Sequence, residues 1–322
     1  MPAFVRDEIG EKTLVRANRA AGFDADLIEE RNFFVPQHAV MNFIDVVGKA
    51  SGEANFGLVI APMMNVATYG SFGRYVLEAE TLGAAIKRAI AALNYHSTHD
   101  RLVTSACGEE IRFSYGFALA GAPSYDIVAV VAAGELLSVF RTYLPSSWRP
   151  LRVELDIPKP SRTTPFEDIF QCPVIFNASA VTIVAERHRL AASTKRTSPG
   201  MMTLADVAQD RAGGAPQSLL QVTVEQIRTQ LLTGTIMIDD IARSMDTSVR
   251  TLQRELYRVN TDFRSLTNTV RTQRAIELLQ YSGLSITNIS EDLGYSSPAG
   301  FTRAFQKATG YGPREFRDRN LK

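Results

Sequence analysis

The sequence of 322 residues has only two cysteines, and several other features that would point directly to a function are missing. Cys107 and Cys172 are too few and too isolated for a disulfide framework or a thiolate metal site, so we expect two buried free thiols. No uncharged apolar run is long enough to span a membrane, and the first residues have no signal-peptide pattern. We therefore expect a cytoplasmic protein that does not bind a membrane.

Groups able to carry catalysis or bind a metal are also scarce. His96 and His99 have a spacing that can bind a metal, but no further ligand lies in register, so a capping or surface role is favoured. Arg16 and Arg19 could meet a phosphate-bearing ligand, although surface charges are the commoner explanation. Cys107 lacks the setting of a catalytic nucleophile, and neither common phosphate-binding glycine loop is present. We predict no enzyme activity, no metal and no cofactor.

What the sequence does contain is an internal repeat in its last hundred residues. The stretch 241–256 aligns with 289–305, and matched residues lie 48 or 49 positions apart. The matched residues are Leu252 and Phe301, Arg254 and Arg303, and Leu256 and Phe305. Each copy thus places one arginine between two apolar residues, which is typical of a helix-turn-helix unit. Two such units predict two contacts with one DNA duplex.

The expected helix ends support this interpretation. Ser285 can cap a first helix that Gly294 ends in the left-handed conformation. Ser297 can then cap a second helix with Pro298 in its first turn. In the first copy Ser248 is the expected cap. The following helix, 271–279, has helical apolar spacing and would join the two units rigidly, and the tail 310–317 would close the domain.

The outward faces of the two second helices carry the chemistry. Arginine and glutamine read guanine and adenine edges in the major groove. For a single arginine, a solvated surface is as common a role as a DNA contact, but repetition at matched positions favours DNA. The side chains expected to face outward are Arg250, Gln253, Arg254 and Arg258 in the first copy, and Ala299, Thr302, Arg303, Gln306 and Lys307 in the second.

These residues resemble a known family. The stretch from about 236 to 317 is similar to the DNA-binding domain of AraC/XylS transcription regulators, in which a linking helix joins two helix-turn-helix units. The motifs that match in order and spacing are Leu252-Gln253-Arg254, Arg271…Ala275…Leu278-Leu279, Leu293-Gly294-Tyr295, Phe301-Thr302-Arg303 and Gly310…Pro313…Phe316-Arg317. The family usually has Glu-Ile-Ala where this chain has Asn288-Ile289-Ser290. Residues 298–300 also offer few hydrogen bonds to bases, so the second unit is expected to read less sequence.

Composition divides the chain into two domains. Residues 217–322 hold 14 Lys and Arg against 11 Asp and Glu, a net charge of +3, although the whole chain carries only +1. The positive surplus therefore lies in the part expected to meet DNA. Loose stretches at 191–200 and 211–216 indicate a linker, with a short helix between them at 201–209. We expect a first domain at 1–190, a linker at 191–216 and a DNA-binding domain at 217–322.

The first domain has a mixed α+β pattern. We expect helices at 33–48, at 82–94 after an N-cap at Thr81, and at 127–143. We expect extended segments at 69–79, 102–107, 111–117, 151–157 and 174–184, the last broken at 177–179. The segments 102–107 and 111–117 would form a hairpin, against whose sheet the helix at 127–143 would pack.

This half resembles the arabinose-binding type of N-terminal domain found in many AraC-type regulators. The match, over roughly 10–190, rests on Phe56-Gly57-Leu58, Tyr69-Gly70, Thr81-Leu82-Gly83 and Cys172…Phe176. In the family such a domain senses a small molecule or mediates self-association. The matched positions are apolar residues and glycines, so they specify a fold, and no effector-binding residue can be assigned from them.

We therefore expect a sequence-specific DNA-binding transcription regulator that responds to a small-molecule effector. It would act as a homodimer on double-stranded DNA, with RNA polymerase as a further partner if it is an activator. The alternative is a DNA-binding regulator whose first domain only dimerises. The residues assigned to bases are Arg250, Gln253 and Arg254 in one major groove and Thr302 and Arg303 in the next, and those assigned to phosphates are Lys307, Arg314 and Arg317. The sequence does not identify the effector or the operator.

Overall fold

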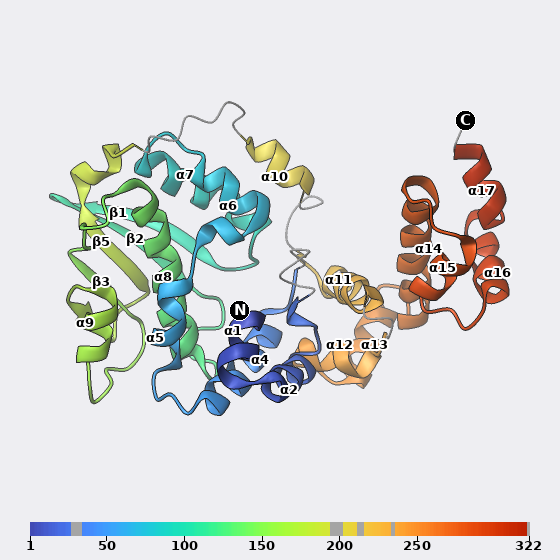
Figure 1. Cartoon of the computed structure of the whole chain (residues 1–322), viewed down its shortest axis with the longest axis horizontal. Coiled ribbons are helices and arrows are strands. Elements are labelled where there is room, and N and C mark those ends of the chain that lie inside the picture. Colours follow the sequence, from blue (N-terminus) through green and yellow to red (C-terminus); the bar gives the residue numbers. More distant parts are fainter. Residues whose placement is uncertain (27–33, 194–201, 211–215, 233–235, 321–322) are drawn as a thin grey trace. The chain divides into compact units, whose positions relative to one another are not determined.

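The structure, a computed structural model, describes residues 1–26, 34–193, 202–210, 216–232 and 236–320 (Figure 1). Its contacts divide the chain into two units. One joins Met1–Phe43 to Pro216–Lys322, and the other is Ile44–Ala215. We call them the helical unit and the sheet unit. The start of the predicted helix at 33–48 and most of the loose linker stretches fall outside the described residues.

A five-stranded mixed sheet organises the sheet unit, in the order β1-β2-β5-β3-β4. Only β3 and β4 pair in parallel; the other neighbours are antiparallel. The strands are β1 (Arg101–Cys107), β2 (Glu110–Gly116), β3 (Arg152–Glu154), β4 (Val174–Ile175) and β5 (Val181–Glu186). The helices are α4 (Gln37–Ser51, which begins in the other unit), α5 (Phe56–Ile60), α6 (Gly70–Leu77), α7 (Leu82–Ala92), α8 (Tyr125–Tyr143), α9 (Thr164–Phe170) and α10 (Leu204–Asp210). The predicted α+β class is confirmed.

Several predicted elements of this unit are present. The hairpin forms with Gly108 at a φ of +56°, and Ala106 pairs with Ile111 across it. The Thr81 hydroxyl accepts a hydrogen bond from the Ala84 amide at 3.2 Å, which caps α7. The long helix α8 packs on the sheet, where the rings of Phe113 and Phe140 lie 6.3 Å apart. The short helix expected within the linker is α10, and the strand expected at 174–184 is broken as predicted.

One predicted element is wrong. The segment 69–79 was expected to be extended, but most of it is the helix α6, which buries Phe72, Gly73 and Val76 on one face. Helix α6 lies so close to the preceding turn that a Cβ on Gly73 would be 1.9 Å from the Val66 carbonyl oxygen. Aromatic residues, which by composition favour a strand, here pack on the buried face of a helix, and Gly73 allows its close approach to the turn. Tertiary contact thus overrides local propensity.

The two thiols differ in exposure. Cys172 is buried as predicted, and burial raises the pKa of its thiol to about 11. The prediction for Cys107 is wrong, because this residue ends the outermost strand β1 and is exposed. Both cysteines are unpaired. None of the described helices combines the length and apolar character needed to cross a membrane.

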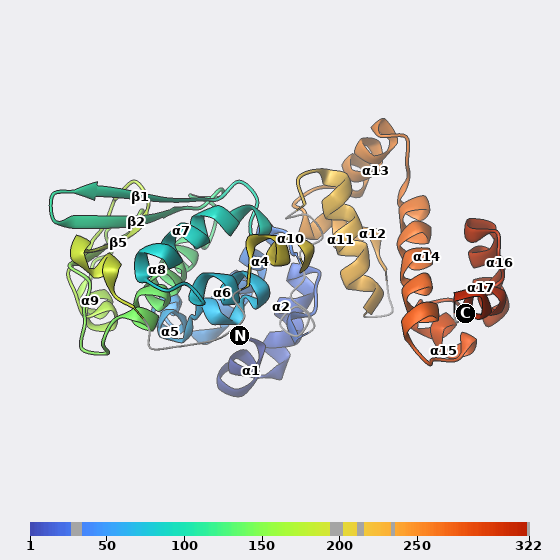
Figure 2. The ribbon, with the colours of Figure 1, turned by 90° about the horizontal axis from the view of Figure 1, so that it is seen from above.

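The C-terminal helices of the helical unit share one core. The helices are α11 (Leu219–Leu232), α12 (Ile238–Ser244), α13 (Val249–Arg258), α14 (Phe263–Tyr281), α15 (Ile286–Asp292), α16 (Pro298–Thr309) and α17 (Pro313–Asn320). Figure 2 shows α14 between α11–α13 on one side and α15–α17 on the other. A single apolar cluster runs through them, from Ile227 of α11 through Ala275 and Leu279 of α14 to Phe305 of α16. The linking helix is therefore part of the core of both helix pairs.

The start of the chain packs against this group of helices. It forms α1 (Pro2–Phe4), the π-helix η1 (Val5–Ile9) and α2 (Glu11–Ala21), and α2 contacts α12. Gly22 ends α2 at a φ of +73°, where a Cβ would lie 2.8 Å from the Asp240 carbonyl oxygen. The Gln226 side-chain amide donates to the Phe34 carbonyl at 3.3 Å. The sequence does not indicate that residues 1–43 lie with the C-terminal helices.

Candidate nucleic-acid interface

Helix α13 is the second helix of the first predicted unit. The Ser248 hydroxyl accepts from the Thr251 amide at 3.1 Å, so the expected cap is confirmed. Leu252 and Leu256 are completely buried. One face of α13 is thereby fixed to the core, and the opposite face is presented to solvent.

Helix α16 repeats the arrangement with larger side chains. The Ser297 hydroxyl accepts from the Gly300 amide at 3.2 Å, and Pro298 occupies the first turn. Phe301 and Phe305 are only 1% exposed, so the predicted match with the leucines of α13 is confirmed. The preceding helix α15 begins at the predicted cap, where Ser285 accepts from the Asn288 amide at 3.1 Å.

The turns between the paired helices also correspond. Asp246 follows α12 at a φ of +49°, and Gly294, 48 residues later, follows α15 at +69°. Both residues are left-handed, a conformation that glycine adopts freely and aspartate tolerates. The repeat therefore extends to the backbone conformation of the turn. Only the second copy has a glycine at this left-handed position, so only that copy reveals it in the sequence.

The outer face of α13 is polar and accessible. Arg250 and Gln253 are exposed, and neither side chain has a hydrogen-bond partner in the described part of the chain. Arg254, with its side chain 61% exposed, contacts the Glu255 carboxylate at 3.3 Å. Arg258 donates to both oxygens of the same carboxylate, at 2.9 and 3.0 Å. Exposed ion pairs of this kind are worth little, so these arginines can exchange Glu255 for DNA at small cost.

The outer face of α16 is also polar and accessible. Arg303, Gln306 and Lys307 are exposed. Thr302 is half-buried, and its hydroxyl donates to the Pro298 carbonyl at 2.9 Å, which leaves only its acceptor capacity for DNA. The expectation that the second unit reads less sequence than the first stays a prediction.

The two arginines of α17 that were assigned to phosphates are held differently. Arg314 is exposed. Arg317 is half-buried, and one of its amino groups donates to the Leu284 carbonyl at 2.7 Å, which ties α17 to the loop before α15. Its guanidinium is thus partly used within the fold, whereas those of Arg303 and Arg314 bind no other residue that the structure describes.

Two further residues were given no role from the sequence. Tyr257, near the end of α13, is 81% exposed, which is unusual for so large an aromatic side chain. The repeat offered a signal, because Tyr257 aligns with Gln306 on the outward face of α16. Arg271 of α14 lies over the ring of Tyr295, with 5.1 Å between the guanidinium carbon and the ring centre. Arg271 belongs to a motif that carries the family resemblance, but that motif does not indicate its contact with Tyr295.

The histidines considered as metal ligands lie in the sheet unit. His96 stacks on Phe72, with 4.6 Å between ring centres, and its ring centre is 4.7 Å from that of Tyr69. His99 is exposed at a φ of +66°. Within the described ranges, no group of three or more His, Cys, Asp or Glu side chains is placed to hold a metal ion.

Comparison with known families identifies both parts of the chain. Residues 15–193 match the arabinose-binding domain of AraC transcription regulators, and residues 241–319 match a helix-turn-helix domain. The chain belongs to the AraC family of transcription regulators. It has the two-helix-pair DNA-binding domain of that family and is a transcription regulator, not an enzyme. The helix pairs described above are thus its DNA-binding elements.

Relatives of this AraC-family chain include proteins of Pseudomonas aeruginosa. The ornithine utilization regulator is 25% identical over 275 residues, which cover 83% of this chain and 79% of the relative. The regulator VqsM is 28% identical over 162 residues, 48% of this chain and 49% of VqsM. The crystal structure of the regulator CdpR aligns over 93% of this chain and 97% of its own, with 19% identity and a TM-score of 0.43.

Proposed function

We propose that this regulator places α13 and α16 in successive major grooves of one DNA duplex and changes its DNA affinity when a small molecule binds its N-terminal domain. The observation that carries the first part is the matched pair of capped helices, each with two buried apolar residues and a polar outer face. Recognition helices that read adjacent grooves are spaced about 34 Å apart along the duplex.

Base recognition is assigned to five residues. Arg250, Gln253 and Arg254 read one groove, because all three are exposed on α13 and have the donors that suit guanine and adenine. Thr302 and Arg303 read the next groove. Lys307, Arg314 and Arg317 contact phosphates, with Arg317 the most restricted because it also holds the Leu284 carbonyl.

Effector responsiveness is supported by the arabinose-binding type of N-terminal domain and by a relative named for ornithine utilization. We place the sensing domain at 1–190, the linker at 191–216 and the DNA-binding domain at 217–322. A DNA-bound homodimer in the cytoplasm would present four recognition helices and gain affinity through effective concentration. If the protein is an activator, as the urease operon relative is by name, RNA polymerase is a further partner.

The alternative function, dimerisation without a ligand, also has an observation in its favour. Strand β1 pairs with β2 alone among the described strands, and Val103 on it is 54% exposed. An exposed edge strand is a ready site for pairing with a second chain. Self-association through β1 is therefore compatible with either function.

Calorimetric titration of the effector with and without operator DNA separates the two. If the effector changes the affinity of the protein for DNA by some factor, then DNA must change the affinity of the protein for the effector by the same factor. We expect effector affinity to differ between the two titrations. Equal affinities would mean that no equilibrium coupling exists and would favour the dimerisation function.

A further inference from the structure

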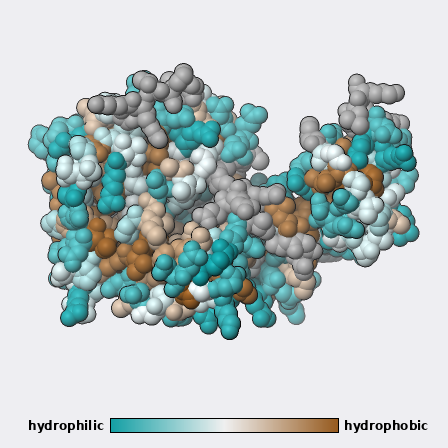
Figure 3. All heavy atoms as spheres, viewed as in Figure 1, coloured by the Kyte–Doolittle hydropathy of each residue, from teal (hydrophilic) through white to brown (hydrophobic). Residues whose placement is uncertain are grey.

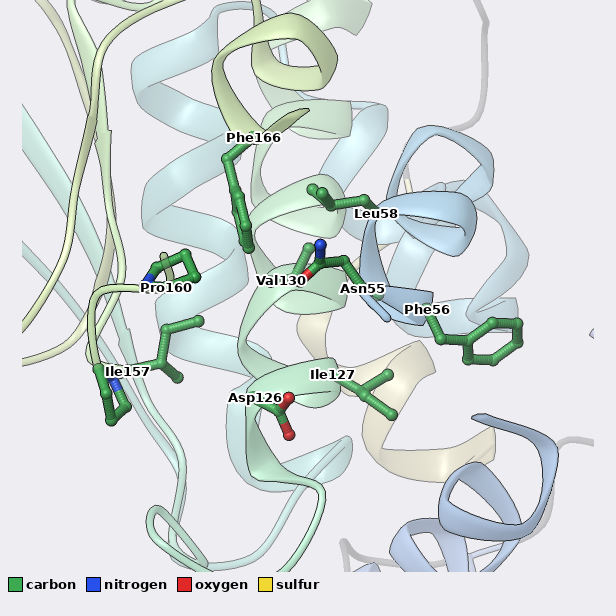
Figure 4. A pocket seen from close by; sticks show the side chains of 11 residues that line it. Asn55, Phe56, Leu58, Asp126, Ile127, Val130, Ile157, Pro160 and Phe166 are labelled. Atoms are coloured by element: carbon green, nitrogen blue, oxygen red, sulfur yellow. The ribbon is translucent and has the colours of Figure 1, made fainter. Parts of the chain in front are cut away.

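A cleft in the sheet unit has the size and lining of a small-molecule site. It lies between α5, the first turns of α8, the loop after β3 and α9, and its volume is about 310 Å³. Pockets for small ligands begin near 300 Å³. Because one water molecule takes up ~30 Å³, the cleft has room for about ten groups of the size of a water molecule. Figure 4 shows it bounded by Leu58, Val130, Ile157 and Phe166, all of them buried apolar residues.

Close packing of two helices forms one wall. A Cβ on Gly57 of α5 would lie 2.9 Å from the Val130 Cβ and 3.0 Å from the Ile127 carbonyl oxygen of α8. Glycine at this position lets the helices touch. Opposite, Pro158 and Pro160 stiffen the loop after β3. The cleft is therefore held open by rigid elements, as a preformed ligand site requires.

Two polar side chains line this mainly apolar cleft. Asn55 is half-buried on the α5 side, and Asp126 is exposed at the start of α8 (Figure 4). Neither makes a side-chain hydrogen bond to any described residue: Asn55 precedes α5 without capping it, and Asp126 stands in the first turn of α8. The neighbouring carboxylate of Asp156 is already occupied, because the Tyr125 hydroxyl donates to its two oxygens at 2.7 and 2.9 Å.

The surface around α5 is also apolar. Val59 and Met63, which follow the cleft-lining residues of α5, are 39% and 46% exposed. Figure 3 shows hydrophobic residues gathered over this region of the face in view. An apolar ligand would therefore meet apolar surface at the entrance as well as inside.

Building on the effector responsiveness proposed above, we propose that this cleft binds the effector and that the effector is a small, mainly apolar primary amine. Its apolar body fills the space between Leu58, Val130 and Phe166, and its ammonium group donates to the Asp126 carboxylate. The one formal charge in the lining is negative, which favours a cationic ligand over a carboxylate of equal size.

The test uses three probes of one shape, namely phenethylamine, phenethyl alcohol and phenylacetate, titrated into the full chain by calorimetry. We expect phenethylamine to bind about tenfold more tightly than phenethyl alcohol, and phenylacetate to bind most weakly. Asp126→Asn should remove the preference for the amine but still bind the alcohol, which shows that the cleft is intact. Asn55→Phe, which breaks no hydrogen bond, should block all three probes. Glu109→Gln, an exposed carboxylate outside the cleft, is the matched control and should change nothing.

The proposal is overturned if none of the probes binds at millimolar concentration, if phenylacetate binds best, or if Asp126→Asn keeps the preference for the amine. A separate measurement of DNA affinity with and without phenethylamine tests the regulatory function. Binding of the amine in the cleft without any change in DNA affinity would support the site as a ligand site and contradict its role in regulation. A change in DNA affinity that survives Asn55→Phe would support effector responsiveness but place the effector elsewhere.

Discussion

The guanidinium of Arg271 lies over the ring of Tyr295, 5.1 Å from its centre, and so joins the linking helix to the turn of the second helix pair. The Tyr295 ring is in turn 5.4 Å from the ring of Phe301, which anchors α16 to the core. Orientation of the second recognition helix thus depends on a contact from α14. Burial raises the pKa of the Tyr295 hydroxyl, and the positive charge of Arg271 opposes that rise.

Removal of this contact is expected to loosen the second helix pair. Arg271→Ala should lower the free energy of unfolding by about 1–2 kcal/mol, because a partly desolvated cation–π contact is lost. Arg264→Ala, an exposed arginine on the same helix, should change it by less than about 0.5 kcal/mol. Chemical denaturation measures both. Equal effects of the two substitutions would mean that the contact with Tyr295 contributes nothing.

Ser290 offers a substitution that should stabilise the protein. Its side chain is completely buried, and its hydroxyl has no hydrogen-bond partner among the described residues. The matched residue of the first copy is Ala242, also buried. Ser290→Ala should raise the free energy of unfolding by about 1 kcal/mol, because an unsatisfied buried hydroxyl is removed. A lower denaturation midpoint for this variant would show that the hydroxyl is satisfied in solution.

The left-handed turns at Asp246 and Gly294 should respond oppositely to exchange. Asp246→Gly should stabilise the chain by about 0.5–1 kcal/mol, since glycine adopts this conformation without steric cost. Gly294→Ala should destabilise it by about 1–2 kcal/mol. The two variants can be compared by thermal unfolding. A destabilised Asp246→Gly would mean that the aspartate side chain makes a contact worth more than the backbone strain.

A pH dependence is expected from Glu135 in α8. Burial raises the pKa of its carboxyl from 4.5 to about 7, although the hydrogen bond donated by Tyr69 opposes this rise. Because the folded value is the higher one, the stabilising contribution is complete below about pH 4.5 and is lost as the pH rises towards 7. Denaturation midpoints over this range should fall less steeply for Glu135→Gln than for the native chain or Glu109→Gln. An unchanged slope in Glu135→Gln would exclude Glu135 as the group responsible.

The DNA-binding elements could be predicted from the sequence because their signals are local. Helix caps such as Ser248 and Ser297, and buried pairs such as Leu252 and Leu256, depend on residues within one or two helical turns. The repeat then tied the two copies together without knowledge of the fold.

Other features depend on contacts distant in sequence, which no local pattern encodes. The segment of helix α6 was predicted to be extended. Its helix packs closely against Val66 through a glycine, and the local sequence pattern does not show this contact. Docking of α2 on α12 joins the first residues to the C-terminal helices. The candidate cleft combines α5, α8 and α9, and α9 was not predicted at all. Asn55 and Asp126 carry no motif, so only the structure brings them together.

The central claim is that α13 and α16 read bases in successive grooves of one duplex, and selection of binding sites from random DNA tests it most directly. The native chain, Arg254→Ala and Arg303→Ala are compared at one salt concentration. Each substitution should cost about 1–3 kcal/mol and relax base preference at one position, and the two positions should lie about 10 base pairs apart. Uniform loss of affinity with unchanged base preference in both variants, or relaxation at the same position, would contradict the account.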